Sequence, residues 1–243
     1  MSLSQTLRGA AARALGKSAR VEQIVAMSPR VVRVRLSSAR LAASEIPPGA
    51  KIKLHVGHGE MRSYTPVVSE GADGTMDVVV YAHADGAACR WVRQLTVGDD
   101  VAFIGPSTSV RGPDGPLPWA CIYGDETAIG LAEAIVGALP AGTPVVGALE
   151  TAAEDAAALT DSRLDAVLRG QTHGDALMDH LKQLDLPPGD GVVWLSGEAS
   201  AVLRLRQALL DRGLVREQLR IKPYWSLKGK AHRKKLERTV LRS

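Results

Sequence analysis

A short segment near residue 62 combines side chains that can hold a planar ligand carrying a diphosphate. The segment is Arg62-Ser63-Tyr64-Thr65, within a stretch, 61–68, that predicts a β-strand. On a strand Arg62 and Tyr64 share a face, so a guanidinium that binds phosphate oxygens in pairs would lie beside a ring that stacks on the ligand. Thr65 adds a hydroxyl within reach of a ring nitrogen. By itself, the tetrapeptide is better explained as an ordinary strand with an exposed arginine.

Other recognisable chemistries are missing from the sequence. It contains no Gly-x-Gly-x-x-Gly after a predicted strand and no Gly-x-Ser-x-Gly, and Gly16-Lys17-Ser18 lacks the earlier glycine of a phosphate-binding loop. The six histidines do not have the spacing of a zinc-binding helix, and no cluster of cysteines or carboxylates accompanies them. We therefore expect no metal site.

The elements around Arg62 indicate an antiparallel β domain. Alternating apolar and polar residues predict short strands with turns at regular spacing, which is typical of a closed barrel rather than an open sheet. One helix, 87–95, interrupts this pattern. The six predicted strands are 19–26, 30–37, 51–56, 61–68, 76–83 and 100–104.

A stretch rich in proline and glycine, 105–118, separates this region from a second region, in which the apolar residues recur in a different pattern. Beyond it, short apolar strands alternate with helices, which predicts βαβ units and a doubly wound parallel sheet. The predicted strands are 119–123, 143–149, 164–168 and 191–196, and the helical segments are 125–139, 152–159, 175–184 and 198–212. The expected parts are an N-terminal helical segment (1–16), a barrel domain (17–115), an α/β domain (116–226) and a basic C-terminal helix or tail (227–243).

Composition places the chain among globular proteins. It has 243 residues, of which 45% are hydrophobic and 23% charged, and only two cysteines, which indicates a reducing compartment and the cytoplasm. No apolar run is long enough to span a bilayer, and the N-terminus lacks the apolar core of a secretory signal. The net charge of +4 divides into +8 for residues 216–243 and −4 for the rest. The basic end suggests an anionic partner, but without interleaved aromatic residues we do not expect nucleic acid.

The order of these motifs resembles the ferredoxin-reductase-like flavoproteins and, within them, the siderophore-interacting proteins, which are flavin-dependent ferric-siderophore reductases. The resemblance spans roughly residues 17–230 and is specific only as a combination of motifs. The matching motifs are Lys53-Leu54, Arg62-Ser63-Tyr64-Thr65, His83, Gly86-Ala87-Ala88-Cys89-Arg90-Trp91, Gly98-Asp99, Gly105-Pro106, Gly124-Asp125-Glu126-Thr127-Ala128, Trp194-Leu195-Ser196-Gly197-Glu198-Ala199 and Tyr224-Trp225. The resemblance implies a six-stranded antiparallel flavin-binding barrel followed by a doubly wound parallel-sheet domain.

The resemblance also implies which residues form the site. FAD would be bound by Arg62, Tyr64, Thr65, His83 and the segment Gly86, Ala87, Ala88 and Cys89. Cys89 departs from the family, which usually has a serine there, so one phosphate contact would be lost. Asp125, Glu126, Thr127, Gly197 and Glu198 would face the crevice at the carboxyl ends of the parallel strands, where such sheets bind ligands. Asp125 equally suits the N-cap of the next helix, so its role stays open.

The implied reaction is reduction of a ferric siderophore by the flavin, with NAD(P)H or reduced ferredoxin as donor. Glu150, at the end of a predicted strand, either takes a ribose hydroxyl and favours NADH or is a solvated carboxylate. Lys53, Lys228 and Lys230 would form a basic wall that selects anionic ferric complexes. The alternatives are a general NAD(P)H-flavin reductase and a ferric-siderophore-binding protein that has lost flavin.

Overall fold

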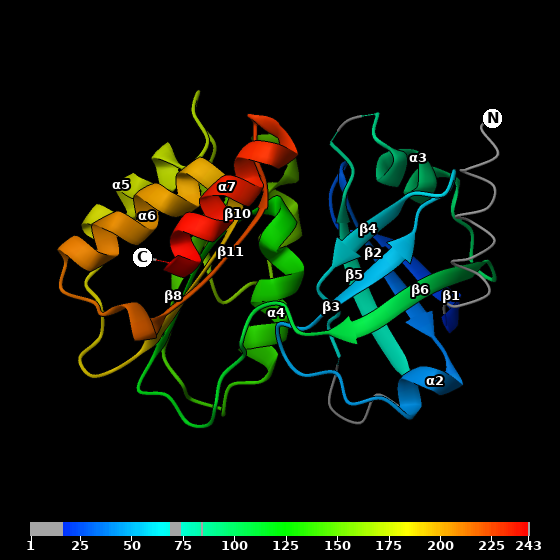
Figure 1. Cartoon of the computed structure of the whole chain (residues 1–243), viewed down its shortest axis with the longest axis horizontal. Coiled ribbons are helices and arrows are strands. Elements are labelled where there is room, and N and C mark those ends of the chain that lie inside the picture. Colours follow the sequence, from blue (N-terminus) through cyan, green and yellow to red (C-terminus); the bar gives the residue numbers. More distant parts are fainter. Residues whose placement is uncertain (1–16, 69–73, 84, 243) are drawn as a thin grey trace. The chain divides into compact units, whose positions relative to one another are not determined.

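The computed structural model describes residues 17–68, 74–83 and 85–242, and it divides into two compact units (Figure 1). The first unit ends at Gly112 and the second begins at Pro113. The N-terminal helical segment predicted for residues 1–16 lies outside the described residues.

The first unit is a six-stranded antiparallel sheet that curls into a barrel. Its strands are β1 (Lys17–Ala26), β2 (Val31–Ser37), β3 (Lys51–His55), β4 (Met61–Tyr64), β5 (Thr75–Tyr81) and β6 (Asp100–Ser107), in the order β4-β3-β6-β1-β2-β5. The outermost strands come together where Val67 and Asp77 form an isolated antiparallel bridge. The short helix α2 (Ala39–Ala42) follows β2, and α3 (Ala87–Gln94) follows β5. This confirms the predicted antiparallel barrel.

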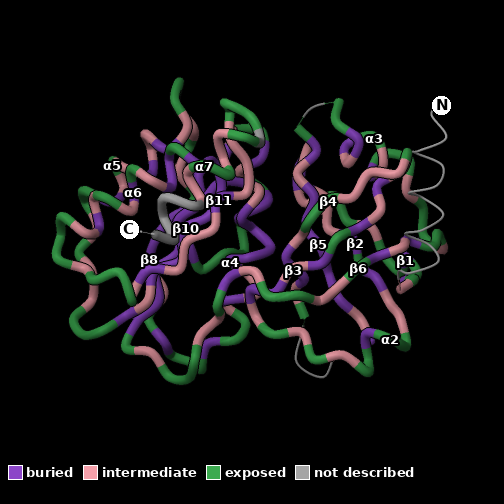
Figure 2. Tube along the Cα trace, viewed as in Figure 1, coloured by how far each residue is buried: buried purple, intermediate pink, exposed green. Residues whose placement is uncertain are grey.

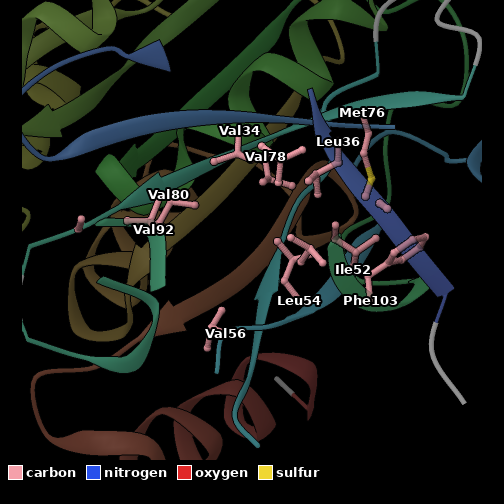
Figure 3. Close-up of a cluster of buried hydrophobic side chains, with 14 of the residues drawn as sticks. Val34, Leu36, Ile52, Leu54, Val56, Met76, Val78, Val80, Val92 and Phe103 are labelled. Carbon is pink, nitrogen blue, oxygen red and sulfur yellow. The ribbon is translucent and has the colours of Figure 1, made fainter. Parts of the chain in front are cut away.

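Alternate side chains of each strand fill the interior of the barrel. Val34, Leu36, Ile52, Leu54 and Phe103 are all fully buried and point into one apolar cluster, which Figure 3 shows. Every second residue of a strand points to the same face, so each strand contributes alternate side chains to this core. The core therefore fixes which side chains of β4 face inward and which face solvent.

The second unit is a five-stranded parallel sheet. Its strands are β7 (Ala120–Asp125), β8 (Val145–Thr151), β9 (Asp165–Leu168), β10 (Val192–Glu198) and β11 (Leu219–Trp225), in the order β11-β10-β7-β8-β9. The connecting helical segments are η1 (Glu126–Ala128), α4 (Ile129–Gly137), η2 (Ala153–Leu159), α5 (Asp175–Gln183), α6 (Ala199–Asp211) and η3 (Arg216–Gln218). After β11 the chain forms the basic helix α7 (Gly229–Arg242).

Both faces of this sheet are buried, as the tube of Figure 2 shows for the central strands. In β7, Cys121 and Tyr123 pack in one cluster with residues of α5 and α6, whereas Ala120 and Ile122 are buried on the other face. A strand buried on both sides is a continuous apolar run, which is why the sequence predicts a parallel sheet here. The doubly wound arrangement is confirmed.

The structure also departs from the sequence-based expectations in the second unit. Although Arg220 and Lys222 alternate with apolar residues as in a strand, β11 was not predicted, because Pro223 cannot donate to a ladder. Since β11 is an edge strand, the proline is tolerated there. The helical segment expected at 152–159 is the 3-10 helix η2.

Candidate functional site

Strand β4 carries the arginine and tyrosine on one face. Its register with β3 places Arg62 opposite Leu54 and Tyr64 opposite Ile52, and both partners point into the barrel core. Residues directly opposite each other on paired strands share a face. The predicted alignment of Arg62 and Tyr64 therefore exists.

Lys53 points its side chain to the other face of the sheet. It lies opposite Ser63, so its exposed side chain points away from the face that Arg62 and Tyr64 share. The structure thus brings Lys53 onto the strand beside β4, but not onto the face that Arg62 and Tyr64 share.

Tyr64 is packed against the barrel core beside the start of α3. Burial raises the pKa of its phenol, nearby Cys89 raises that pKa further, and the Arg62 guanidinium opposes the rise. Tyr64 packs against the core cluster that contains Cys89, so residues that are 25 positions apart in the sequence belong to one packed region. The Tyr64 phenol is therefore neutral, which suits stacking rather than acid–base work.

The start of α3 offers backbone N–H groups rather than side chains. Gly86 is the N-cap with no side-chain hydrogen bond, and a Cβ built on it would meet no atom within 4 Å. The first N–H groups of a helix lack partners in the helix and attract anions. Gly86 is exposed and Ala88 half-buried, whereas Ala87 and Cys89 are buried. Cys89 belongs to the barrel core, so its thiol packs instead of facing a ligand.

The remaining predicted residues of the first unit differ in exposure and in their contacts. Arg62 is exposed and forms an ion pair of 2.5 Å with Glu60, which the sequence did not point to. Thr65 is buried, with 6% of its surface exposed. His83 is exposed and stacks on Tyr81 with 4.7 Å between ring centroids.

The barrel is open along one side of β4. One edge of β4 pairs with β3, and among the described residues the pairing with β5 consists of the single bridge at Val67. Arg62, Tyr64 and Thr65 precede that bridge. A ligand can therefore approach the side chains of Arg62 and Tyr64 from this side of β4, whereas Thr65 is buried.

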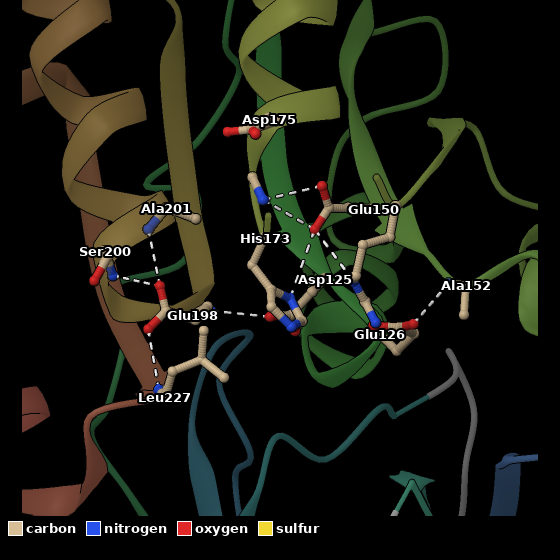
Figure 4. A network of polar contacts seen from close by, with 12 residues as sticks. Asp125, Glu126, Glu150, Ala152, His173, Asp175, Glu198, Ser200, Ala201 and Leu227 are labelled. Carbon is tan, nitrogen blue, oxygen red and sulfur yellow. Dashed lines mark hydrogen bonds and ion pairs between the residues drawn. The ribbon is translucent and has the colours of Figure 1, made fainter. Parts of the chain in front are cut away.

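In the second unit, three parallel strands end in a buried carboxylate, and Figure 4 shows how these groups are engaged. Asp125, at the end of β7, accepts hydrogen bonds from the backbone N–H of Thr127 (2.9 Å) and Glu198 (2.9 Å) and from the indole of Trp225 (2.8 Å). Burial raises the pKa of Asp125, and the bonds from Thr127 and Trp225 lower it. Asp125 is the N-cap of η1 and also joins β7 to β10 and β11.

Glu126 and Glu150 share one arginine. Glu126 accepts from the N–H of Ala152 (2.9 Å) and forms an ion pair with Arg169. Glu150, at the end of β8, accepts from the N–H of Gly174 (3.0 Å) and from Nε of Arg169 (3.3 Å). Burial raises the pKa of Glu150, while the Gly174 N–H and Arg169 oppose the rise. With 1% of its surface exposed, Glu150 is not the solvated carboxylate that one interpretation expected.

Glu198, at the end of β10, caps the helix that follows it. It accepts from the N–H groups of Ser200 (2.6 Å), Ala201 (3.0 Å) and Leu227 (3.2 Å). Gly197 has φ +112°, and a Cβ on it would lie 2.6 Å from Oδ2 of Asp125. The glycine therefore permits Asp125 to approach the end of β10.

The structure brings the predicted acidic residues together at one edge of the sheet, but it turns them toward their own backbone. Sequence reasoning missed Arg169 and His173, and it gave Trp225, although part of a matching motif, no contact in this network. Arg169 directly follows β9, and this placement at a strand end is the signal that could have identified it. Lys228 is exposed, and the side chain of Lys230 lies outside the described residues.

The described residues offer no further candidate of two kinds, a metal site and a membrane-spanning helix. No group of three or more histidine, cysteine or carboxylate side chains among them could hold a metal ion. Within the same residues, no helix is both long and apolar enough to cross a membrane.

Two family models match the chain, one for each unit. The oxidoreductase FAD-binding domain matches residues 18–111, and the siderophore-interacting protein model matches residues 117–228. The solved structure of the siderophore-interacting protein SipS from Aeromonas hydrophila superposes with a TM-score of 0.75 at 23% identity, covering 93% of this chain and 98% of that one. That likeness supports the fold.

Two curated proteins are similar over shorter spans. The NADPH-dependent ferric-chelate reductase of Escherichia coli is 25% identical over 171 residues, which are 69% of this chain and 66% of that protein. The plasma membrane-associated coenzyme Q6 reductase PGA3 of Saccharomyces cerevisiae is 33% identical over 88 residues, 35% of this chain and 28% of that protein. The chain thus spans less than two thirds of either relative.

The two models follow each other along the chain in the order of the two structural units, and Arg62 and Tyr64 lie within the first. An FAD-binding oxidoreductase domain is thus followed by a segment that matches the siderophore-interacting protein model, which confirms the predicted resemblance to that family.

Proposed function

We propose that the chain binds FAD in its first unit and uses it to reduce the iron of ferric siderophores, releasing Fe(II). The observation that supports this most directly is the Arg62–Tyr64 pair on one face of β4, at the open edge of the barrel and beside the start of α3. Siderophores hold Fe(III) through hard anionic oxygens that suit Fe(II) poorly, so reduction frees the metal.

The residues of this site fit FAD. Arg62 would bind the diphosphate, and the N–H groups that open α3 would add donors for it, with Gly86 leaving the approach clear. Tyr64 would pack against the flavin ring, and the backbone along the open edge of β4 would hold its polar rim. When bound, the flavin accepts two electrons as a hydride and delivers them one at a time. The protein supplies binding, orientation and exclusion of water.

Reduced pyridine nucleotide is the proposed electron donor, and reduced ferredoxin is the alternative. The doubly wound second unit and the ferric-chelate reductase relative, whose name specifies NADPH, favour the nucleotide. The expectation that Glu150 would select NADH through a ribose hydroxyl is not supported, because that carboxylate is held by Gly174 and Arg169. The two free cysteines are buried, and a cytoplasmic location remains a prediction.

The proposed activity predicts FAD-dependent release of Fe(II) under anaerobic conditions. The protein loaded with FAD should reduce ferric tricatecholate and ferric trihydroxamate complexes with NADH or NADPH, as followed by a coloured Fe(II) chelator. Protein without FAD is the control and should release no Fe(II). Tight binding of the ferric complex without FAD uptake would instead show a siderophore-binding protein. Faster reduction of quinones or free flavins than of ferric complexes would show a general reductase.

The substrate-binding role of Lys53, Lys228 and Lys230 is also a proposal. Their attraction for an anionic complex would be screened over about 8 Å at physiological salt, so reduction of a tricatecholate complex should slow as ionic strength rises. Lys53→Ala and Lys228→Ala should lower kcat/KM for that complex severalfold and leave a neutral trihydroxamate complex unaffected. Arg40→Ala, at an exposed position of α2, is the matched control. Equal rates for all variants with both complexes would contradict the proposal.

A further inference from the structure

The second unit differs from a dinucleotide-binding sheet at the place where such sheets bind the diphosphate. The strand order β11-β10-β7-β8-β9 reverses direction between β7 and β10, and ligands of doubly wound sheets bind at the carboxyl ends of the strands at this switch point. Here Asp125 spans the switch point, because its carboxylate accepts the N–H of Glu198, 2.9 Å away at the end of β10. The crevice is therefore closed by the protein itself.

The backbone donors at this edge are also engaged. Diphosphates bind such sheets through N–H groups at helix starts. In this chain the N–H of Thr127, which opens η1, donates to Asp125, and the N–H groups of Ser200 and Ala201, which open α6, donate to Glu198. Gly174, which precedes α5, donates to Glu150. Each of the three helical segments thus begins against a carboxylate of this chain.

Charge at the edge is also unfavourable for a diphosphate, and the cavity that Asp125 helps to line is small. Asp125, Glu126, Glu150 and Glu198 are each at most 3% exposed, and the cation among them, Arg169, bridges Glu126 and Glu150. The cavity lined by Asp125, Glu150, His173 and Glu198 has a volume of about 10 Å³, which is the space of one water molecule. Nδ1 of His173 has no hydrogen-bond partner among the described residues and lies 3.8 Å from Glu150, where such a water would bridge them.

The flanking cations do not replace these donors. Arg204 binds Asp175 (2.6 Å) and the carbonyl of His173 (2.6 Å). Lys228 is exposed and offers a single hydrated charge without a planar pair of donors.

We infer that the carboxyl edge of this sheet excludes the diphosphate of a dinucleotide, and that any reduced pyridine nucleotide is recognised through its nicotinamide half alone. This rests on the proposed use of such a donor to reduce FAD. In that step a hydride, two electrons and one proton, passes from the dihydronicotinamide to the flavin and leaves an oxidised nicotinamide. The adenosine half of NADH or NADPH then contributes nothing to the rate.

Binding of ADP-ribose tests the inference without requiring flavin reduction. Titration calorimetry of the full chain should give a dissociation constant above about 1 mM for ADP-ribose, and a value below this would overturn the inference. Glu198→Gln keeps the size of the cap but removes its charge, so it should bind ADP-ribose about tenfold more tightly than the wild type. The matched control is Glu217→Gln, an exposed position in η3 at the amino end of β11, which should match the wild type. Equal affinities for both variants would show that this charge does not exclude the diphosphate.

Anaerobic stopped-flow bleaching of bound FAD gives the second readout. Reduced nicotinamide mononucleotide should reach a kcat/KM within about threefold of NADH and NADPH. A dinucleotide that is faster by about 100-fold or more would overturn the inference. If no nicotinamide bleaches the flavin and ADP-ribose does not bind, the exclusion stands and the proposed donor is wrong.

Discussion

In the Arg62→Ala variant, the dissociation constant for FAD is expected to rise by about 10- to 100-fold, because a charge-assisted hydrogen bond contributes about 1.5–3 kcal/mol. Arg62 is exposed at the open edge of β4, so the loss concerns the ligand and not the core of the barrel. Titration of apoprotein with FAD, followed by flavin fluorescence, measures the effect. Unchanged FAD affinity would contradict the assignment of Arg62 to the diphosphate.

Glu60→Gln is the informative companion of this variant. Before FAD binds, Glu60 pairs with Arg62 at 2.5 Å, and both side chains are nearly half exposed. An exposed ion pair contributes about 0.2–1 kcal/mol, so its removal should tighten FAD binding by up to about fivefold. Arg40→Ala, an exposed substitution on α2, should leave FAD binding unchanged. Weaker binding in Glu60→Gln would mean that Glu60 positions Arg62 and does not compete for it.

In the Asp125→Ala variant, we expect the free energy of unfolding to fall by about 4 kcal/mol. Each buried donor left without an acceptor costs about 1–3 kcal/mol, and the costs of neighbouring donors are not fully additive. The donors affected are the N–H groups of Thr127 and Glu198 and the indole of Trp225. Scanning calorimetry should show a lower Tm, by about 10 °C. Asp161→Ala, at an exposed position, should change it little. A loss as small as that of Asp161→Ala would show that the network does not join these segments.

The pH dependence of Asp125→Asn should separate charge from hydrogen bonding. Burial raises the pKa of Asp125 in the folded state, so its shift stabilises the fold below the ordinary pKa, and this contribution is lost as pH rises through the raised value. Asparagine does not ionise. The stability deficit of Asp125→Asn relative to the wild type should therefore shrink as the pH of a denaturant-unfolding series rises above the ordinary pKa of an aspartate.

Local patterns were enough to predict the barrel and the β4 pair. Alternation in 51–56 and 61–68 predicts which residues of β3 and β4 share a face, and the register of Arg62 and Tyr64 follows from it. The strand β11 was missed because Pro223 and its basic neighbours suit an edge strand and not a central one. Edge position depends on the topology of the whole sheet, which a local window does not contain.

The acidic residues of the second unit show more clearly than β11 what a single sequence does not reveal. Their position at the ends of β7, β8 and β10 was predictable, because parallel strands end at one edge. Their partners were not: Glu150 bonds to Gly174 and Asp125 to Trp225, far along the chain. Glutamate is also not a preferred N-cap residue, so nothing local indicated that Glu198 caps α6. A carboxylate that binds a ligand and one that binds its own backbone look alike in sequence.

The open side of β4 has a consequence for how this protein behaves when FAD is scarce. A strand edge with free N–H and C=O groups is a template for a strand from another molecule, and proteins oppose such pairing with charged side chains. Glu60 and Arg62 place opposite charges at the start of β4, before the bridge at Val67. Without FAD these charges would still oppose pairing of this edge with a strand of another chain, so they would disfavour sheet-to-sheet aggregation of the apoprotein.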